Sequence, residues 1–356
     1  MRHPKVPLGS RSKPEWPSPD LVLTQARLNR YMRVTIDPLE AARALADGHL
    51  AALPTETVYG LGARADQAHA IAQIYVAKAR PAHHPLIAHL PSRESLDDWG
   101  REIPEFARKL AVAHWPGPLT LVVNRTKRAG DFLTGAQDSV AVRVSAHPVM
   151  QAVQGELVRI TGDTSIAIAA PSANRFGQVS PTSADHVIEE LGAFLSQHDV
   201  VLDGGACGIG LESTIIDCTG MNPRMLRPGA ITIEQVEATT GMRCTHDSKV
   251  RASGTLQSHY SPRAQVILLT KEELQSGDYI ASAARVGMLA TADIPTMIGL
   301  VRLGEPESLQ DYARLLYWAL READALELKT ILAVPPPNEG LGVAINDRLS
   351  RAAHPK

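Results

Sequence analysis

The stretch LPTETVYGLGARADQAHAIAQIYVAKARPAHHPLIAHL, from Leu53 to Leu90, decides the fold. It predicts, in order, a strand over 51–54, a tight turn or a close ligand approach at Gly60 and Gly62, a helix from Ala68 that ends before Pro81, and a strand over 86–90. Three polar residues, 55–57, stand where the first apolar run ends. Strands alternating with helices are typical of α/β proteins.

The strand expected over 86–90 presents different residues on its two faces. A period of two places Ile87 and His89 on one face and Leu86, Ala88 and Leu90 on the other. A single histidine on a strand is either a structural residue with satisfied hydrogen bonds or a ligand-binding residue. The spacing alone leaves both interpretations open.

Two cations, Lys78 and Arg80, lie at the end of the expected helix, beside the glycine-rich segment. Cations in such a place suit a polyphosphate. The alternative is that they only complement the negative C-terminal end of the helix dipole. The chain has no Walker pattern here, so the argument is not one for a P-loop.

The composition bounds the classes of function. The chain has 356 residues, 44% hydrophobic and 21% charged, which fits a globular protein of one large domain or two smaller ones. A net charge of −2 and 4% aromatic residues argue against a nucleic-acid coat and a base-stacking platform. Three cysteines without a CxxC pair indicate reduced thiols of a cytoplasmic protein and no zinc site. No apolar run is long enough to span a bilayer.

The rest of the chain divides into four parts. We expect a poorly ordered extension at 1–31, a first domain at 32–243, a linker at 244–263 and a smaller α/β domain at 264–356. We expect further helices over 37–48, 103–114, 180–191, 309–320 and 341–353, and strands over 119–123, 140–144, 166–170, 213–218, 264–270 and 330–334. Ser180 or Thr182 is the expected cap of its helix, whose N-terminus would attract phosphate. Met1 and Met32 both stay open as the start.

Polar residues interrupt several of these strands and strand ends. Arg143 alternates with apolar residues, which places it at a solvated edge or, beside a pocket, against a carboxylate. The tetrapeptide Pro171–Asn174 follows a strand, where open sheets present binding groups, although an ordinary turn explains it equally. Arg227 stands just before a Pro-Gly turn.

Together these motifs resemble a known family. PTETVYGLG, KARP, PLIAHL and PSAN, in this order, are similar to the YrdC-like family, specifically its long two-domain L-threonylcarbamoyladenylate synthases. The segment HYSP at 259–262 resembles the HYxP segment that joins the two domains in such proteins. The resemblance extends from about Ala41 to the C-terminus. It implies a twisted mixed sheet with surrounding helices, followed by a smaller three-layer, Rossmann-like α/β domain.

The resemblance also implies a reaction. Members use L-threonine, bicarbonate or CO2, and ATP to make threonylcarbamoyl-AMP and pyrophosphate, for modification of the adenosine next to the tRNA anticodon. Mg²⁺ is expected with ATP, held mainly by phosphates and water. The implied partners are these substrates, the downstream tRNA threonylcarbamoyl-transfer machinery and a weak RNA contact, in the cytoplasm and without a membrane.

Site residues follow from the matched motifs. The resemblance implies Lys78, Arg80 and Asn174 as catalytic residues, with no metal ligand. It implies Thr57, His89, Arg143, Ala170 and Ser213 as the L-threonine site. It implies Arg80, His84, Ser172, Ser180, Arg227 and Tyr260 as the ATP site, with Tyr260 as a lid. His84 departs from the family's asparagine, so a solvated turn residue is an equal alternative for it.

Two other functions are alternatives to the synthase activity that the resemblance implies. A YrdC-like domain can also be a non-catalytic RNA-binding module, which would release no pyrophosphate. A carbamoyltransferase of hydrogenase maturation would carry zinc-finger and acylphosphatase modules, which the chain lacks.

Overall fold

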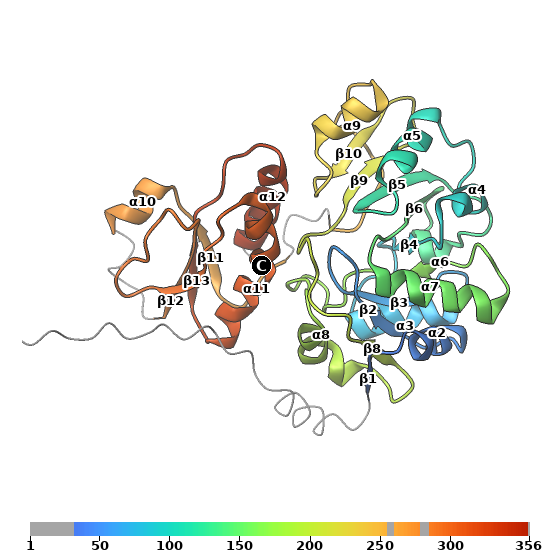
Figure 1. Ribbon diagram of the computed structural model, residues 1–356, viewed down its shortest axis with the longest axis horizontal. Coiled ribbons are helices and arrows are strands. Elements are labelled where there is room, and N and C mark those ends of the chain that lie inside the picture. The colour runs from blue at the N-terminus through green and yellow to red at the C-terminus, as the bar shows by residue number, and fades with distance from the viewer. Residues whose placement is uncertain (1–31, 255–259, 278–284, 355–356) are drawn as a thin grey trace, which may run out of the picture.

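The computed structural model describes residues 32–254, 260–277 and 285–354 (Figure 1). The expected extension at 1–31 lies outside the described residues. The chain forms two bodies, one around a ten-stranded mixed sheet and one around a four-stranded parallel sheet. An α/β fold with a smaller second α/β domain is thus confirmed.

The large sheet supplies the framework for the site. Its strands are β1 (Arg33–Thr35), β2 (Ala51–Leu53), β3 (Gly60–Arg64), β4 (Ile87–His89), β5 (Leu119–Asn124), β6 (Ser139–Arg143), β7 (Ile168–Ala169), β8 (Val200–Leu202), β9 (Thr214–Asp217) and β10 (Arg224–Arg227). They run in the order β1-β8-β2-β3-β7-β4-β6-β5-β9-β10. Neighbours β4 and β6 are parallel, and their register sets His89 opposite Arg143. The two predicted site residues are therefore adjacent.

Helices cover both faces of this sheet. They are α2 (Pro38–Ala46), α3 (Ala68–Lys78), α4 (Leu96–Trp99), α5 (Glu105–His114), α6 (Asp131–Thr134), α7 (Pro148–Thr161), α8 (Ala184–Leu191) and α9 (Ile233–Thr240). α2 and α7 form one core with β2 and β8, while α3, α4 and α5 belong to a larger core on the other side. Asp37 caps α2 as expected, because its carboxylate accepts from Leu39 N at 2.9 Å.

A third apolar cluster lies where no helix covers the sheet. Ile87, Val122 and Ile215 pack there with Ala252, and Val250 is partly buried against them. Residues 250 and 252 belong to the expected linker, so this segment covers the strands that carry His89 and Arg143. The predicted alternation in β4 is confirmed, because Leu86, Ala88 and Leu90 join the core on the opposite face.

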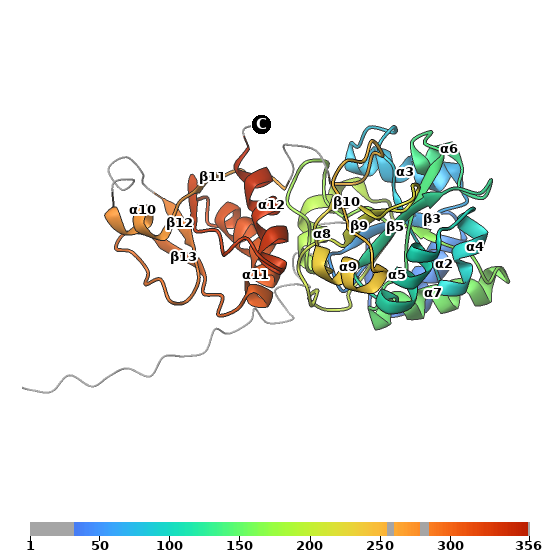
Figure 2. The same ribbon diagram turned by 90° about the horizontal axis from the view of Figure 1, so that it is seen from above.

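The smaller domain has three layers, because helices pack on both faces of its sheet. Its strands β11 (Gln265–Leu268), β12 (Val286–Leu289), β13 (Val301–Gly304) and β14 (Thr330–Ala333) are parallel, in the order β11-β14-β12-β13. Its helices are α10 (Lys271–Ser276), α11 (Leu309–Ala325) and α12 (Leu341–Ala353). α10 packs on one face, and α11 and α12 pack on the other. Figures 1 and 2 both show α11 and α12 between this sheet and the large body. None of the described helices is both long and apolar enough to cross a lipid bilayer.

The prediction of a tight turn at Gly60 and Gly62 is wrong. Gly60 and Gly62 lie in β3, which pairs antiparallel with β2, and the chain reverses in the preceding residues 55–59. A Cβ on Gly62 would lie 2.9 Å from the Ala51 carbonyl oxygen, and one on Gly60 would lie 2.9 Å from Ala170 Cβ. The glycines thus allow close packing of strands around the pocket wall.

Two further expectations need correction. The helix expected at Ser180 or Thr182 is capped by Ser183, whose hydroxyl accepts from His186 N, and Ser180 is buried before it. Of the two alternatives left open for Arg143, the solvated edge is excluded, because β6 lies inside the sheet and the side chain is only 4% exposed.

Candidate active site

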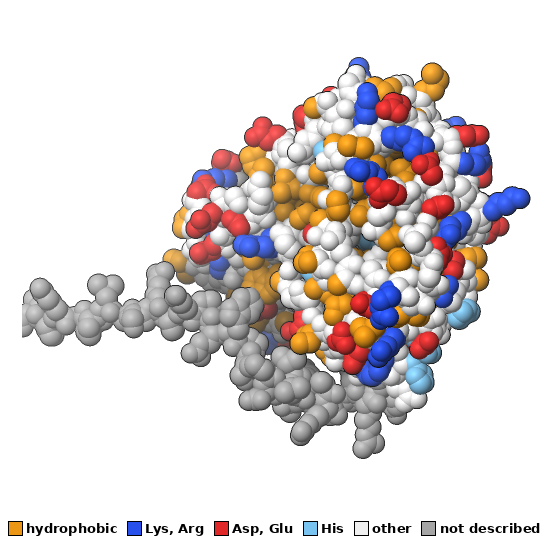
Figure 3. Space-filling model, turned by 45° about the vertical axis from the view of Figure 1, so that its right-hand side comes forward, with side chains coloured by type: hydrophobic (Ala, Val, Ile, Leu, Met, Phe, Trp, Pro, Cys, Tyr) orange, Lys and Arg blue, Asp and Glu red, His pale blue; other side chains and the backbone are white. Residues whose placement is uncertain are grey.

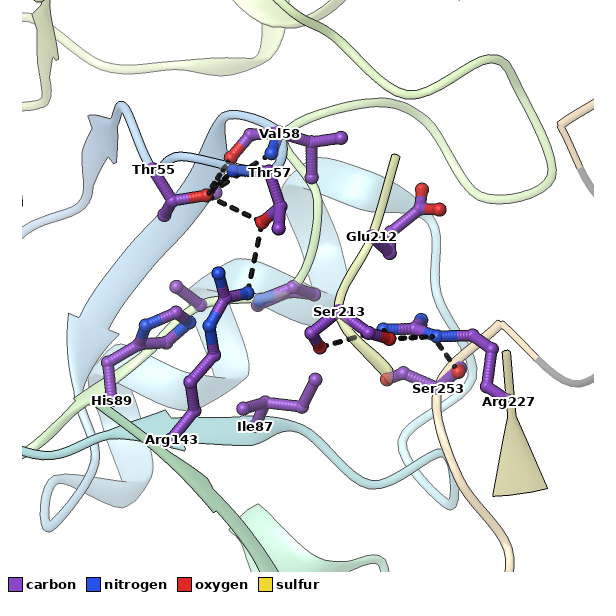
Figure 4. A pocket seen from close by; sticks show the side chains of 13 residues that line it. Thr55, Thr57, Val58, Ile87, His89, Arg143, Glu212, Ser213, Arg227 and Ser253 are labelled. Carbon is purple, nitrogen blue, oxygen red and sulfur yellow. Dashed lines mark hydrogen bonds between the residues drawn. The ribbon is translucent and has the colours of Figure 1, made fainter. Parts of the chain in front are cut away.

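A pocket opens on the face of the large sheet that carries His89 (Figure 4). It is lined by Thr55, Thr57, Val58, Gly60, Ile87, His89, Arg143, Ala170, Pro171, Glu212, Ser213, Arg227 and Ser253. All five residues predicted for L-threonine are in this set, together with Arg227 from the ATP set. The structure therefore brings these positions together, and their individual roles stay predictions.

Arg143 is the cation at the base of the pocket. Its Nη1 donates to Thr57 Oγ1 at 3.0 Å, and its Nε donates to the Gly117 carbonyl at 3.2 Å. Its Nη2 lies 2.7 Å from Glu56 Oε1. A buried guanidinium with its plane fixed in this way is suited to bind a carboxylate.

His89 lies beside Arg143 in the pocket wall (Figure 4). Burial and the neighbouring Arg143 lower the pKa of His89 to about 3, so the imidazole is neutral at physiological pH. Its Nδ1 is buried and has no hydrogen-bond partner among the described residues. A neutral ring nitrogen of this kind can take part in a hydrogen bond with a bound ligand.

Ser213 and Arg227 form the opposite wall. Arg227 donates through Nε and Nη2 to the Ser213 carbonyl, at 3.0 and 2.9 Å, and through Nη1 to the Ser253 carbonyl at 3.0 Å. The Ser213 hydroxyl lies 2.7 Å from Thr120 Oγ1. Figure 4 shows Arg227 and Arg143 approaching the cavity from different sides.

Arg80 joins this wall through the expected linker. Its Nη2 donates to Ser253 Oγ and to the Pro85 carbonyl, each at 3.0 Å, and its Nε has no partner among the described residues. Burial lowers the pKa of Arg80 to about 10, so the side chain stays charged at neutral pH. Arg80 and Arg227 thus meet through Ser253, which sequence reasoning did not single out.

Lys78 supports the loop of residues 171–174. Its Nζ donates to the Ser172 carbonyl at 2.5 Å and to the Asn174 carbonyl. Burial, followed by the charge of Arg80, lowers the pKa of Lys78 well below its usual value. Lys78 does not line the pocket, so its visible role is to hold this loop. This contact is neither binding of a phosphate nor interaction with the helix dipole, the two interpretations that the sequence offered. Asn174 is 1% exposed, and its Oδ1 has no partner within the described chain.

His84 and Tyr260, two further ATP candidates, are not among the residues that line the pocket. His84 packs edge-on against Phe176, whose ring also faces the guanidinium of Arg80. Burial, Arg80, His83 and Arg251 lower the pKa of His84 to about 4. Tyr260 is fully buried, and a Cβ on Gly254 would lie 2.5 Å from Tyr260 Oη and 2.8 Å from Arg227 Nη1. Tyr260 therefore lies close to the arginine wall, and its role as a lid remains a prediction.

Glu212 connects the pocket to the smaller domain. Its carboxylate accepts from Ser180 Oγ at 2.6 Å, from Tyr317 Oη at 2.8 Å and from Arg348 Nε at 3.0 Å. Burial raises the pKa of Glu212, but Arg348, Arg227 and these hydrogen bonds together lower it to about 2. Ser180 thus contacts a carboxylate in this structure, and a residue of α12 neutralises a pocket residue.

Several of these residues were missed by sequence reasoning. Glu56, Glu212, Ser253 and Arg348 carry buried polar contacts of the site, but none was assigned a role. Glu212 directly precedes Ser213, and Glu56 directly precedes Thr57. The only indication in the sequence was that each of these two acids stands next to a residue already assigned to the site. The pairing of Glu212 with Arg348, 136 positions apart, has no local signature in the sequence.

The mixed sheet, the appended parallel sheet and the pocket with its carboxylate-binding and phosphate-binding candidates define a two-domain YrdC-like α/β protein. Comparison with known proteins agrees. Residues 43–229 match a family model described as "Telomere recombination", and residues 231–354 match one described as "Threonylcarbamoyl-AMP synthase, C-terminal domain". The chain belongs to the threonylcarbamoyl-AMP synthase family, a family of enzymes.

Individual relatives are similar over almost their full length. The threonylcarbamoyl-AMP synthase of Pyrococcus abyssi is 37% identical over 332 residues, which cover 88% of this chain and 93% of the relative. The Bacillus subtilis protein of the same name is 37% identical over 335 residues, or 90% and 94% of the two chains. The solved structure of P. abyssi Sua5 complexed with L-threonine has a TM-score of 0.79 and 35% identity, covering 90% of this chain and 97% of that chain.

Proposed function

We propose that this chain makes threonylcarbamoyl-AMP from L-threonine, bicarbonate or CO2, and ATP, and releases pyrophosphate. The observation that carries the proposal is one pocket in which Arg143 and Arg227 form separate walls, with Arg80 joined to the second wall through Ser253. One cation suits an amino-acid carboxylate, and the other two suit phosphates. The relative with L-threonine bound supports the choice of amino acid.

The proposed reaction has two steps. The neutral threonine amine adds to CO2 and loses a proton, which gives a carbamate. A carbamate oxygen then attacks the α-phosphorus of ATP, and the bond to the bridging oxygen breaks as pyrophosphate leaves. Negative charge grows on phosphate oxygens, so positioning and electrostatic stabilisation supply the catalysis. No side chain of the chain has to act as a nucleophile.

Each wall of the pocket has a role in these steps. Arg143 and Thr57 would hold the threonine carboxylate, and neutral His89 would face the substrate beside them. Arg80 and Arg227 would stabilise the departing pyrophosphate, with Lys78 fixing the loop that carries Ser172 and Asn174. Ser253 closes this side, which limits access of water to the carbamate.

Mg²⁺ would arrive with ATP. The described residues contain no group of three or more candidate metal ligands. Glu212 is the acid among the described pocket-lining residues. Arg348 and Tyr317 already donate to its Oε2, and Ser180 donates to its Oε1. This donor set does not fit a protein-bound ion, so we propose that phosphates and water hold the metal.

The proposed product is an activated threonylcarbamoyl group. We propose that it serves the tRNA threonylcarbamoyl-transfer machinery in the cytoplasm and modifies the adenosine next to the anticodon. Figure 3 shows Lys and Arg side chains mixed with Asp and Glu on the displayed face, so this face offers no dedicated RNA surface.

Mass spectrometry of the product mixture tests the proposal. Purified protein with Mg-ATP, L-threonine and bicarbonate should form the adduct, and carbon-13 bicarbonate should shift its mass by one carbon isotope. RNA binding without any adduct, under conditions in which a known synthase reacts, would favour the non-catalytic alternative.

A further inference from the structure

The guanidinium of Arg143 is held on three sides. Thr57 Oγ1, the Gly117 carbonyl and Glu56 Oε1 each face a different nitrogen, at 3.0, 3.2 and 2.7 Å. The side chains of Arg143 and Glu56 are 4% and 14% exposed. An arginine has five N–H donors. Nε and one hydrogen of Nη1 make hydrogen bonds, and buried Nη2 meets Glu56 as an ion pair without a hydrogen bond of good geometry, so donors remain on both terminal nitrogens. Two such donors suit the two oxygens of a carboxylate.

Glu56 is itself anchored on the side away from Arg143. Its Oε2 accepts from Ser145 Oγ at 2.5 Å, and its Oε1 accepts from Ala146 N at 3.1 Å. Its backbone carbonyl accepts from Ile209 N at 2.8 Å. The carboxylate therefore connects the loop at 55–59 to the turn between β6 and α7. This turn directly follows the strand that carries Arg143.

Glu56 stands behind the pocket wall. The two threonines that flank it, Thr55 and Thr57, line the pocket, and their hydroxyls lie 2.8 Å apart. Burial raises the pKa of Glu56, but Arg143, Ser145 and Ala146 together lower it to about 2. Glu56 is thus ionised throughout the neutral range and stays paired with Arg143.

We propose that Glu56 is a positioning residue for recognition of the amino-acid carboxylate, acting through Arg143. This inference rests on the proposed function. The carboxylate holds the guanidinium plane so that its remaining donors face the substrate, and Glu56 itself does not touch the substrate. Its negative charge alone would weaken binding of a carboxylate. If Glu56 acts by positioning Arg143, removing its side chain should weaken binding of the carboxylate. If its charge dominates, removing the side chain should strengthen that binding.

The test compares Glu56→Ala with Glu56→Gln. Alanine removes every side-chain anchor, so the KM for L-threonine should rise by about tenfold to a hundredfold, the size of one charge-assisted hydrogen bond. The KM for ATP and the kcat at saturating threonine should change far less. Glutamine keeps an acceptor toward Arg143 and a polar group toward Ser145, so it should restore most of the affinity.

Substrate discrimination separates positioning from a general structural defect. In the wild type, kcat/KM should favour L-threonine over L-threonine amide, which lacks the carboxylate. Glu56→Ala should reduce this ratio by about tenfold or more. Asp199→Ala is the matched control, because Asp199 is a buried acid that accepts from Leu50 N and Ser196 N away from the pocket. It should leave the ratio unchanged.

A second variant covers the case in which Glu56→Ala does not fold. Ser145→Ala removes one anchor of Glu56 and should raise the KM for threonine by a smaller factor. A lower or unchanged KM in Glu56→Ala, or in Ser145→Ala if the first is unfolded, overturns the proposal. Equal loss of affinity in Glu56→Gln and Glu56→Ala also overturns it, since an acceptor held in the same place would then not restore the binding of threonine. A wild type inactive with threonine would instead refute the proposed function and, with it, this inference.

Discussion

At the scale of single residues, the pocket depends on how three buried arginines are held apart. Arg143 is fixed by a carboxylate, a hydroxyl and a carbonyl, whereas Arg80 and Arg227 are bound mainly to backbone carbonyls and to Ser253. Carbonyls carry no net charge, and neither Arg80 nor Arg227 forms a direct ion pair among the described residues, so both can attract an incoming anion. In the proposed reaction this difference assigns the first arginine to threonine and the other two to phosphates.

Arg80→Ala should weaken the use of ATP. Hydrogen bonds to charged groups contribute about 1.5–3 kcal/mol, so the KM for ATP should rise by about tenfold to over a hundredfold. Unfolding by urea, followed by circular dichroism, checks that the variant is folded. Unchanged ATP kinetics in a folded variant would restrict Arg80 to its contacts with Pro85 and Ser253.

His84 should not give ATP binding a pH dependence in the neutral range. Burial and the neighbouring Arg80, His83 and Arg251 lower its pKa to about 4, so the imidazole is neutral above that pH. We expect the KM for ATP between pH 6 and pH 9 to follow the same profile, within about twofold, in the wild type and in His84→Asn. An affinity that falls with rising pH only in the wild type would show that phosphates raise the pKa of His84 on binding.

At the scale of helices and strands, local sequence patterns predicted individual elements, but they did not predict contacts between residues far apart in the sequence. The strand at residues 51–54, the helix ending at Lys78 and the alternation of β4 follow from local spacing, and the structure confirms them. Of the two alternatives predicted for the glycines of β3, the tight turn was wrong, because glycine is equally suited to a turn and to close strand packing. Gly60 lines the pocket, so the close approach of a ligand stays a prediction. Glu212 and Ser253 were missed because their partners lie far away in the sequence.

Helix α12 should be required for the pocket in the other domain. Arg348 neutralises buried Glu212, which lines the pocket next to Ser213. Removing one partner of a buried ion pair costs about 3–5 kcal/mol, so Arg348→Ala should be strongly destabilised and should lose activity. The double variant Glu212→Gln with Arg348→Met should regain part of the stability in urea unfolding. If Arg348→Ala is as stable as the wild type, the pair does not connect the domains energetically.

At the scale of the whole molecule, buried acids make stability depend on pH. The folded state lowers the pKa of Glu212 from 4.5 to about 2, so its contribution is complete above about pH 4.5 and is lost as the pH falls toward 2. The expected loss is on the order of 3 kcal/mol. The free energy of unfolding of the wild type, measured between pH 5 and pH 2, should fall more steeply than that of Glu212→Gln. Parallel slopes would mean that Glu212 does not keep its charge in the folded state.

The two domains together define one catalytic unit in this account. The pocket lies on the large sheet, Ser253 of the expected linker closes one side, and Tyr317 and Arg348 of the smaller domain hold Glu212. The boundaries expected at residues 243 and 263 stay predictions. The central claim is therefore an activity of the whole chain, which needs no RNA and no second protein.

Pyrophosphate release tests that claim most directly. The full chain with Mg-ATP should release pyrophosphate only when L-threonine and bicarbonate are both present, in the absence of RNA. Arg143→Ala should abolish this release at threonine concentrations that saturate the wild type. Release that is independent of threonine or of bicarbonate, or no release under conditions in which a known synthase works, would contradict the account.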